Sequence, residues 1–128
     1  MIILDTHAWI WWADAPSKLS SKARAAMEGG TDIGIAAISC WELAMLVARG
    51  RLQLDRDVLV WIRDSLALPK VRLFPLSPEV AVLAAGLGRD FPGDPADRLI
   101  VSTALVHNAK LISKDQRIRS FKQASAVW

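Results

Sequence analysis

Short apolar runs alternate along this chain with longer segments that carry helix-start and helix-stop residues. The runs are too short for typical helices and are typical of buried strands. Strands are therefore expected at about residues 2–4, 33–38, 71–76, 110–113 and 125–127. Start and stop signals predict helices at about residues 6–14, 20–28 (closed by Gly29 and Gly30), 41–49, 57–68, 78–87 and 94–108, with a brief helix after residue 115.

Strands and helices that alternate in this way form a parallel sheet covered by helices on both faces. A chain of 128 residues, 52% of them apolar, is sufficient for one core, so a single domain spanning residues 1–128 is expected. In such α/β folds the ligand crevice lies beyond the carboxyl ends of the strands. Functional side chains are therefore expected at that edge of the sheet.

Four carboxylates occupy positions that this topology brings to one edge. Asp5 ends the first apolar run, and Asp115 follows shortly after the run at 110–113. Glu42 and Asp97 fall in the first turns of two predicted helices. Since strand ends and the following helix starts share one rim of a parallel sheet, these four acids are expected to converge on one pocket.

A pocket with four carboxylates has to neutralise their mutual repulsion. At least one of them would take a proton at neutral pH unless a cation joins them. Oxygen ligands without cysteine or clustered histidine favour Mg²⁺ or Mn²⁺ over zinc. Such ions activate water and stabilise the leaving oxygen in phosphodiester cleavage. The four acids therefore indicate metal-dependent phosphodiester chemistry.

Helix capping is the alternative interpretation for three of these acids. Ser39 and Glu42 have the spacing of a capping box, which is the favoured reading of Glu42 taken alone. Asp94 precedes Pro95 as an N-cap would, and Asp97 is a common kind of helix-start acid.

Asp115 could likewise cap the brief helix that follows it. Asp5 is the hardest to explain by capping, because an acid that ends an apolar strand must be paired or functional. One shared site explains all four acids better than four independent structural roles.

Four segments, at residues 3–7, 39–44, 94–100 and 111–115, resemble the motifs of PIN-domain ribonucleases and, within that family, of the VapC-type toxins of bacterial toxin–antitoxin pairs. Their order, their spacing and the total length are similar to those of a whole domain of this kind. The resemblance implies a three-layer α/β/α sandwich with a central, mostly parallel sheet. It also implies a Mg²⁺- or Mn²⁺-dependent endoribonuclease.

The same resemblance assigns metal-binding and catalytic roles to Asp5, Glu42, Asp97 and Asp115. Of the two acids in the third segment, Asp97 receives the metal role, and Asp94 is expected to cap the helix or to support the metal ligands from behind. A small antitoxin encoded alongside, whose tail enters the acidic groove, and a homodimer are further expectations from the family.

Hydroxyl and imidazole groups beside the acids have competing interpretations. Thr6 and Ser113 are candidates for positioning water or phosphate, although capping the first helix is at least as good an account of Thr6. His7 could act as a general acid or base or contact RNA, but a structural role is favoured for a lone histidine in a first helical turn. Lys114 is expected to face a phosphate or solvent.

Tryptophan is unusually frequent, with six residues in the chain. Trp9, Trp11 and Trp12 fall together on one short helix, where some are expected in the core and others in a dimer or antitoxin contact. Base stacking is the second interpretation. It ranks lower because the tryptophans lack interleaved basic residues in the sequence.

The charge balance is compatible with a polyanionic ligand. The formal net charge is +3 and the pI is about 9.4. If four acids share a cleft, sixteen basic residues stand against nine acidic ones elsewhere, an excess of about +7. Neither a secretory signal nor a membrane-spanning apolar run is evident, so a cytoplasmic protein is expected.

Two other functions compete with the ribonuclease. An aspartate that closes the first strand also suits a metal-dependent phosphatase or phosphotransferase with Asp5 as nucleophile. Against this, haloacid-dehalogenase-like enzymes carry a second aspartate two residues later, where this chain has His7. The other alternative is a non-catalytic RNA- or protein-binding module, which the presence of all four acids disfavours.

Overall fold

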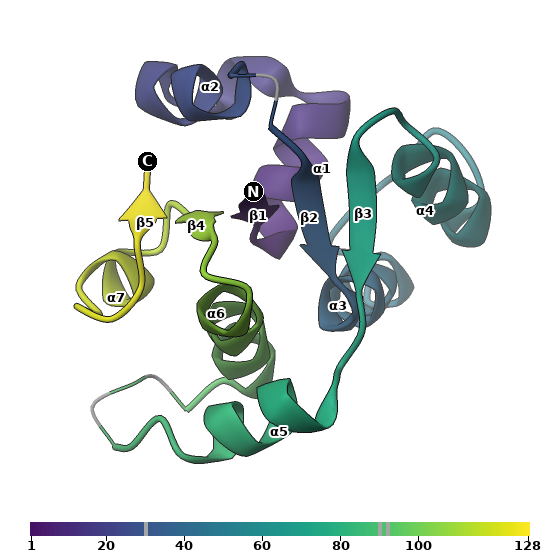
Figure 1. The fold of residues 1–128 in the computed structure, drawn as a ribbon. Coiled ribbons are helices and arrows are strands. Elements are labelled where there is room, and N and C mark those ends of the chain that lie inside the picture. The colour runs from purple at the N-terminus through teal and green to yellow at the C-terminus, as the bar shows by residue number, and fades with distance from the viewer. Residues whose placement is uncertain (30, 90, 92) are drawn as a thin grey trace.

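The computed structural model describes residues 1–29, 31–89, 91 and 93–128, and its centre is a five-stranded parallel sheet (Figure 1). The strand order is β3-β2-β1-β4-β5, and every neighbouring pair is parallel. The strands are β1 (Ile2–Leu4), β2 (Ile33–Ala36), β3 (Val71–Phe74), β4 (Lys110–Ile112) and β5 (Ala126–Val127). The predicted parallel sheet is confirmed.

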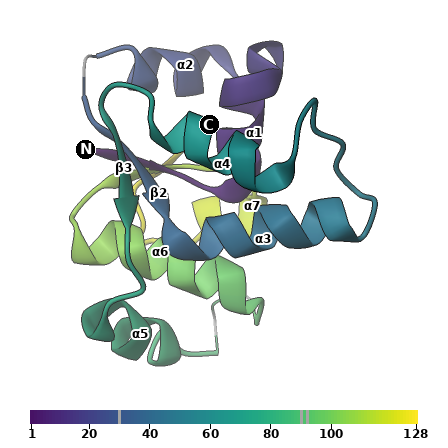
Figure 2. The same cartoon turned by 90° about the vertical axis from the view of Figure 1, so that its right-hand side faces the viewer.

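Helices cover both faces of the sheet, so the three-layer sandwich is confirmed (Figure 2). One layer holds α1, α2 and α4, and the other holds α5, α6 and α7, with α3 continuing directly from β2. In the described part of the chain the helices are α1 (Thr6–Asp14), α2 (Ser21–Met27), α3 (Ala37–Ala48), α4 (Val58–Leu66), α5 (Pro78–Ala85), α6 (Pro95–Val106) and α7 (Gln116–Arg119), with a 3₁₀ turn η1 (Pro16–Lys18).

The pleat of β1 supplies both layers of the core. Ile2 and Leu4 belong to the apolar cluster under α1, whereas Ile3 belongs to the cluster under α6. Trp9 is fully buried in the first cluster, and its indole Nε1 donates a hydrogen bond of 2.7 Å to Ser65 Oγ. The prediction that some tryptophans are core residues is therefore confirmed.

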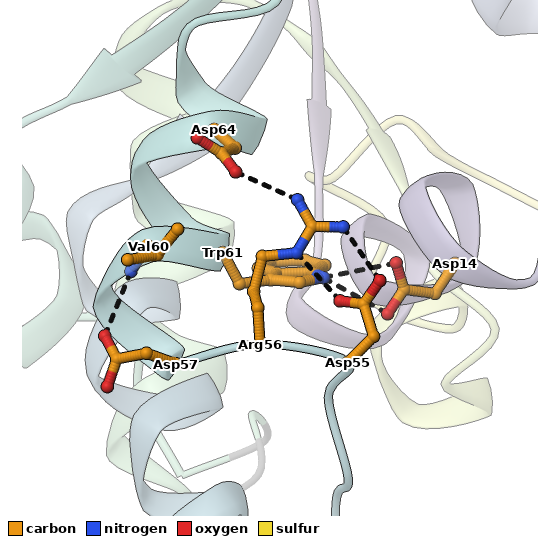
Figure 3. A network of polar contacts seen from close by, with 7 residues as sticks. All are labelled: Asp14, Asp55, Arg56, Asp57, Val60, Trp61 and Asp64. Atoms are coloured by element: carbon orange, nitrogen blue, oxygen red, sulfur yellow. Dashed lines mark hydrogen bonds and ion pairs between the residues drawn. The ribbon is translucent and has the colours of Figure 1, made fainter.

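A polar network fixes the course of the loop between α3 and α4 (Figure 3). Arg56 Nε lies 2.8 Å from Asp55 Oδ1, and Arg56 Nη1 lies 2.9 Å from Asp64 Oδ2 on α4. Asp57 caps α4 by accepting the backbone N–H of Val60. These groups are exposed, so the ion pairs contribute little stability and chiefly hold the loop in place.

The boundary between β2 and α3 differs from the sequence expectation. The strand ends at Ala36 rather than Ile38, and the helix begins at Ala37. Ser39 is therefore the third residue of α3 and not its N-cap. The error has a physical reason: an apolar run reports burial, and both a buried strand and the first turn of a buried helix satisfy it.

The other predicted ends agree with the structure within about two residues. The predicted stop of α2 at Gly29 and Gly30 is only partly visible, because residue 30 lies outside the described residues; α2 itself ends at Met27. Among the described helices, none combines the length and the apolar character required to cross a membrane.

Candidate metal centre

One pocket of about 370 Å³ collects the acids predicted from the sequence. Its lining includes Asp5, Glu42, Asp97 and Asp115, together with Asp94 as a fifth acid. The expected convergence of the four acids on one pocket is therefore present in the structure.

Two of the acids follow neighbouring strands. Asp5 comes directly after β1 and caps α1, its Oδ1 accepting the backbone N–H of Ala8 at 2.9 Å. Asp115 follows β4, which pairs with β1, and caps α7 by accepting the N–H of Arg117 at 2.8 Å. Ser113 Oγ accepts the N–H of Asp115 at 3.1 Å. Parallel pairing of β1 and β4 thus brings both carboxylates to the same edge.

Glu42 reaches the pocket from the second turn of α3, and the alternative interpretation of Glu42 as part of a capping box is wrong. Ser39 lies inside the helix, and its hydroxyl accepts a hydrogen bond from Thr6 Oγ1 at 3.0 Å. A capping box between Ser39 and Glu42 is therefore absent.

Asp94 and Asp97 come from the start of α6. Both hydrogen bonds of the Asp94 cap, from the N–H groups of Ala96 and Asp97, go to Oδ1, so capping occupies one carboxylate oxygen. One carboxylate oxygen from each of Glu42, Asp94 and Asp97 lies within 4.8 Å of the others. The expected helix cap of Asp94 is confirmed, and Asp94 also belongs to the same group of acids as Glu42 and Asp97.

The pKa values report the electrostatic cost of this grouping. Burial, followed by the charges of Asp94, Glu42 and Asp115, raises the pKa of Asp97 to about 7 despite the opposing charge of Arg117. Burial also raises the pKa of Asp5, and it outweighs hydrogen bonds from Ser113 and from the Ala8 amide. Both acids would bind a proton, or a cation in its place, more readily than ordinary aspartates.

The donor set fits a hard divalent cation. The three grouped residues contribute oxygen atoms only, at separations that one ion can bridge. A bound cation would reduce the electrostatic repulsion between their negative charges. The acidic cluster could therefore hold a metal ion of the kind that prefers carboxylate ligands.

Arg117 acts as an internal counterion and was not among the predicted site residues. Its Nη2 lies 3.1 Å from Asp115 Oδ2 and 3.8 Å from Asp97 Oδ2. Burial opposes ionisation of Asp115, but hydrogen bonds from Arg117 dominate and hold the pKa of Asp115 below its ordinary value. The pairing with Asp115 could have been suspected from the sequence, because Arg117 lies only two residues after Asp115, in the first turn of α7.

The remaining wall of the pocket is aromatic and basic. Thr6, His7, Trp11, Lys114 and Arg117 line it beside the acids. Thr6 is buried with its hydroxyl directed to Ser39, whereas His7 is exposed rather than part of the core.

Comparisons with known proteins identify the fold and relatives. A family model described as PIN domain matches residues 2–124. The chain is 41% identical over 126 residues to Ribonuclease VapC22 of Mycobacterium tuberculosis, covering 98% of this chain and 95% of that protein. VapBC2 from Rickettsia felis, solved bound to a DNA fragment from the promoter, superposes with a TM-score of 0.73 at 16% identity, covering 99% of this chain and 98% of that one. A toxin–antitoxin complex from Klebsiella pneumoniae gives a TM-score of 0.67 at 16% identity, covering 100% and 97%.

Proposed function

We propose that this chain, which belongs to the PIN-domain family and within it to the VapC-type ribonucleases, is a toxin endoribonuclease that hydrolyses RNA with Mg²⁺ or Mn²⁺ in its acidic pocket. The observation that carries the proposal is the grouping of Glu42, Asp94 and Asp97 oxygens within 4.8 Å of one another. Such a group is stable in its ionised form only with a counter-cation.

The ligands that would hold the ion are Asp5, Glu42, Asp97 and Asp115, with Asp94 close enough to take part. When bound, the ion supplies Lewis acidity, which lowers the pKa of water and stabilises the leaving oxygen of the phosphodiester. Asp5 is the one buried acid of the five. Because its Oδ1 accepts a hydrogen bond from the Ala8 amide, its carboxylate is held in one position.

Arg117 and Lys114 are the cationic side chains of the pocket, and they suit the phosphates of the substrate. Arg117 is 63% exposed at its side chain and bonded to Asp115, so it can turn from the carboxylates to a phosphate once the acids are neutralised. Lys114 is exposed beside Asp115. The two cations offset the repulsion between an acidic pocket and a polyanion.

The proposed partners are those suggested by the relatives. The Klebsiella pneumoniae relative was solved as a toxin–antitoxin complex, and we extend that association to this chain. A small cognate antitoxin would then neutralise the acidic pocket with a basic side chain. A homodimer and a cytoplasmic location are part of the same proposal.

The decisive experiment incubates the purified chain with total RNA in Mg²⁺, in Mn²⁺ and in EDTA. Cleavage in both metals and none in EDTA is expected. Asp97→Asn is expected to abolish cleavage, whereas the control Asp55→Asn, an exposed carboxylate outside the pocket, is expected to cleave as the parent does. Equal cleavage in EDTA, or full activity of Asp97→Asn, would contradict the proposal.

The phosphatase alternative receives less support from the geometry. A nucleophilic aspartate must reach the phosphorus atom, but Asp5 is only 9% exposed and its Oδ1 is engaged with the α1 backbone. A trapped aspartyl-phosphate on Asp5 would nevertheless replace the ribonuclease proposal with this one.

A further inference from the structure

An aromatic and basic surface borders the acidic pocket; we call it the stacking wall and define it as His7, Trp11, Lys114 and Trp128. The ring of Trp11 lies 5.7 Å from the ring of His7 and 5.5 Å from the ring of Trp128. Lys114 Nζ lies 5.8 Å from the centre of the Trp11 ring, within the range of a cation–π contact. Three of the four residues, His7, Trp11 and Lys114, line the same pocket as the acids.

Trp11 differs from the tryptophans that serve the core. Trp9 and Trp61 are almost completely buried, and each indole N–H donates a hydrogen bond inside the protein, to Ser65 and Asp14 respectively. Trp11 is only partly buried and borders the cavity. Trp11 therefore packs against the apolar cluster under α1 and also forms part of the pocket wall.

The tertiary structure also supplies what the sequence lacked for base stacking. Trp11 has no basic neighbour along α1, but the loop after β4 places Lys114 against its ring, and Arg117 lies in the same pocket. Aromatic surface interleaved with cations is typical of single-stranded nucleic-acid sites, where bases stack and phosphates are neutralised.

We infer that Trp11 and Lys114 form a subsite for one unpaired nucleobase of the RNA and its adjoining phosphate, directly beside the acids that act on the phosphodiester. The inference rests on the proposed ribonuclease function and adds a substrate requirement to it. The base stacks on Trp11, with His7 at the edge of the ring, and Lys114 contacts the phosphate. Cleavage would therefore require a nucleotide that can leave a duplex at the position next to the scissile bond.

The charges favour RNA over a protein segment as the occupant of the stacking wall. An acidic pocket alone would select a basic peptide, but Lys114, Arg117 and the surplus of basic residues outside the pocket attract a polyanion. A flat, partly exposed ring with Lys114 beside it suits the base of a nucleotide that is flanked by phosphates.

The test measures binding of a fluorescein-labelled, unstructured RNA of twelve nucleotides by fluorescence anisotropy. The full chain is used in Ca²⁺, which takes oxygen ligands as Mg²⁺ does, and a gel verifies that the RNA stays intact. An abasic nucleotide is then moved through the RNA one position at a time. In the parent protein, one abasic position is expected to weaken binding about tenfold, as loss of one stacked base does.

Trp11→Leu is expected to weaken binding of intact RNA about tenfold and to remove the sensitivity to that abasic position. The matched control is Trp12→Leu, on the same helix and partly buried but outside the pocket, and it is expected to bind as the parent does. Parental affinity of Trp11→Leu, or equal abasic sensitivity in both proteins, would overturn the inference.

Lys114→Gln tests the same subsite if Trp11→Leu does not fold. The Lys114 side chain is exposed, so this substitution is expected to leave the fold intact. This variant is expected to lower the slope of log affinity against log salt by about one, as loss of one phosphate contact does. The control is Lys110→Gln, an exposed lysine at the opposite end of β4. An unchanged salt slope in Lys114→Gln would overturn the inference.

Failure of the inference and failure of the proposed function give different results. Cleavage in Mn²⁺ without a role for Trp11 refutes the subsite and leaves the ribonuclease. Trp11-dependent binding of RNA without cleavage in Mn²⁺ supports the subsite and refutes the ribonuclease. If Trp11→Leu binds RNA normally but no longer captures the antitoxin, the stacking wall is a protein contact and the inference is overturned.

Discussion

Thr6 Oγ1 donates a buried hydrogen bond of 3.0 Å to Ser39 Oγ across 33 positions of the chain. Thr6 begins α1 directly after Asp5, and Ser39 lies one turn before Glu42 on α3. The bond therefore joins the two segments that carry the acids from β1 and from α3. It contributes to the stability of the fold and to the spacing between Asp5 and Glu42.

Ser39→Ala is expected to lower the free energy of unfolding by about 1–2 kcal/mol, because it leaves the buried Thr6 hydroxyl without its acceptor. Thr6→Val in the same protein is expected to recover part of the loss, since no unsatisfied hydroxyl then remains. Urea denaturation of both single variants and of the double variant measures the coupling. Additive effects of the two substitutions would show that the bond carries no energy of its own.

Asp97 is expected to make the metal-free protein less stable as the pH rises. Its pKa is about 7 in the folded protein against 3.8 for the ordinary carboxyl, so between these values the folded state binds more protons than the unfolded state. The free energy of unfolding therefore falls from about pH 4 to above pH 7. Asp97→Asn removes this loss and is expected to be about 1–2 kcal/mol more stable than the parent at pH 8 in EDTA.

The advantage of Asp97→Asn is expected to vanish near pH 4 and to reverse in saturating Mn²⁺. The parent gains stability from an ion that binds only the folded state, and the variant gains less. Urea titrations at pH 4 and pH 8, with and without Mn²⁺, test both statements. A parent that is more stable than the variant at pH 8 in EDTA would show that the grouped charges do not repel as described.

Arg117→Gln is expected to bind Mn²⁺ up to about fivefold more tightly than the parent. This change in affinity corresponds to the interaction energy of one exposed ion pair. The reason is that Arg117 competes with the ion for Asp115 and Asp97. RNA affinity is expected to fall at the same time, because a phosphate loses a cationic contact. Calorimetry with Mn²⁺ and anisotropy with RNA measure the two effects, and Arg119→Gln on the same helix is the control.

Gly34→Ala is expected to destabilise the protein by about 1–3 kcal/mol through overpacking of the sheet. A Cβ atom at this position in β2 would lie 2.6 Å from Phe74 Cε2 and 2.9 Å from Ile3 Cγ1. Gly29→Ala is the matched control, because a Cβ atom there meets no heavy atom within 4 Å. Thermal melts of the two variants should differ by several degrees, and equal melting temperatures would contradict the close packing.

The order of the elements, and the edge of the sheet at which the acids gather, could be predicted from local sequence patterns. Short apolar runs separated by capped helices permit few arrangements other than a covered parallel sheet, as β1 to β5 show. Once the sheet is parallel, acids at strand ends and helix starts must share one rim. Asp5, Glu42, Asp97 and Asp115 could therefore be expected in one pocket, and the structure places all four there.

The contacts between side chains at that rim could not be predicted in the same way, because they depend on the assembled fold. Ser39 has the spacing of a helix cap, yet β2 ends early enough for α3 to carry it inside and against Thr6. Asp94 caps α6 as expected and still joins Glu42 and Asp97, because one carboxylate oxygen suffices for the cap.

The contacts of the basic side chains Arg117 and Lys114 likewise depend on the assembled fold. Lys114 was expected to face a phosphate or solvent, and Arg117 was not among the predicted site residues, but the fold brings Arg117 on α7 to the acids and Lys114 to Trp11. Local patterns report burial and backbone capping, which depend on residues within a few positions. Ion pairs and ring contacts depend on separations between distant segments, and those exist only once the sheet has assembled.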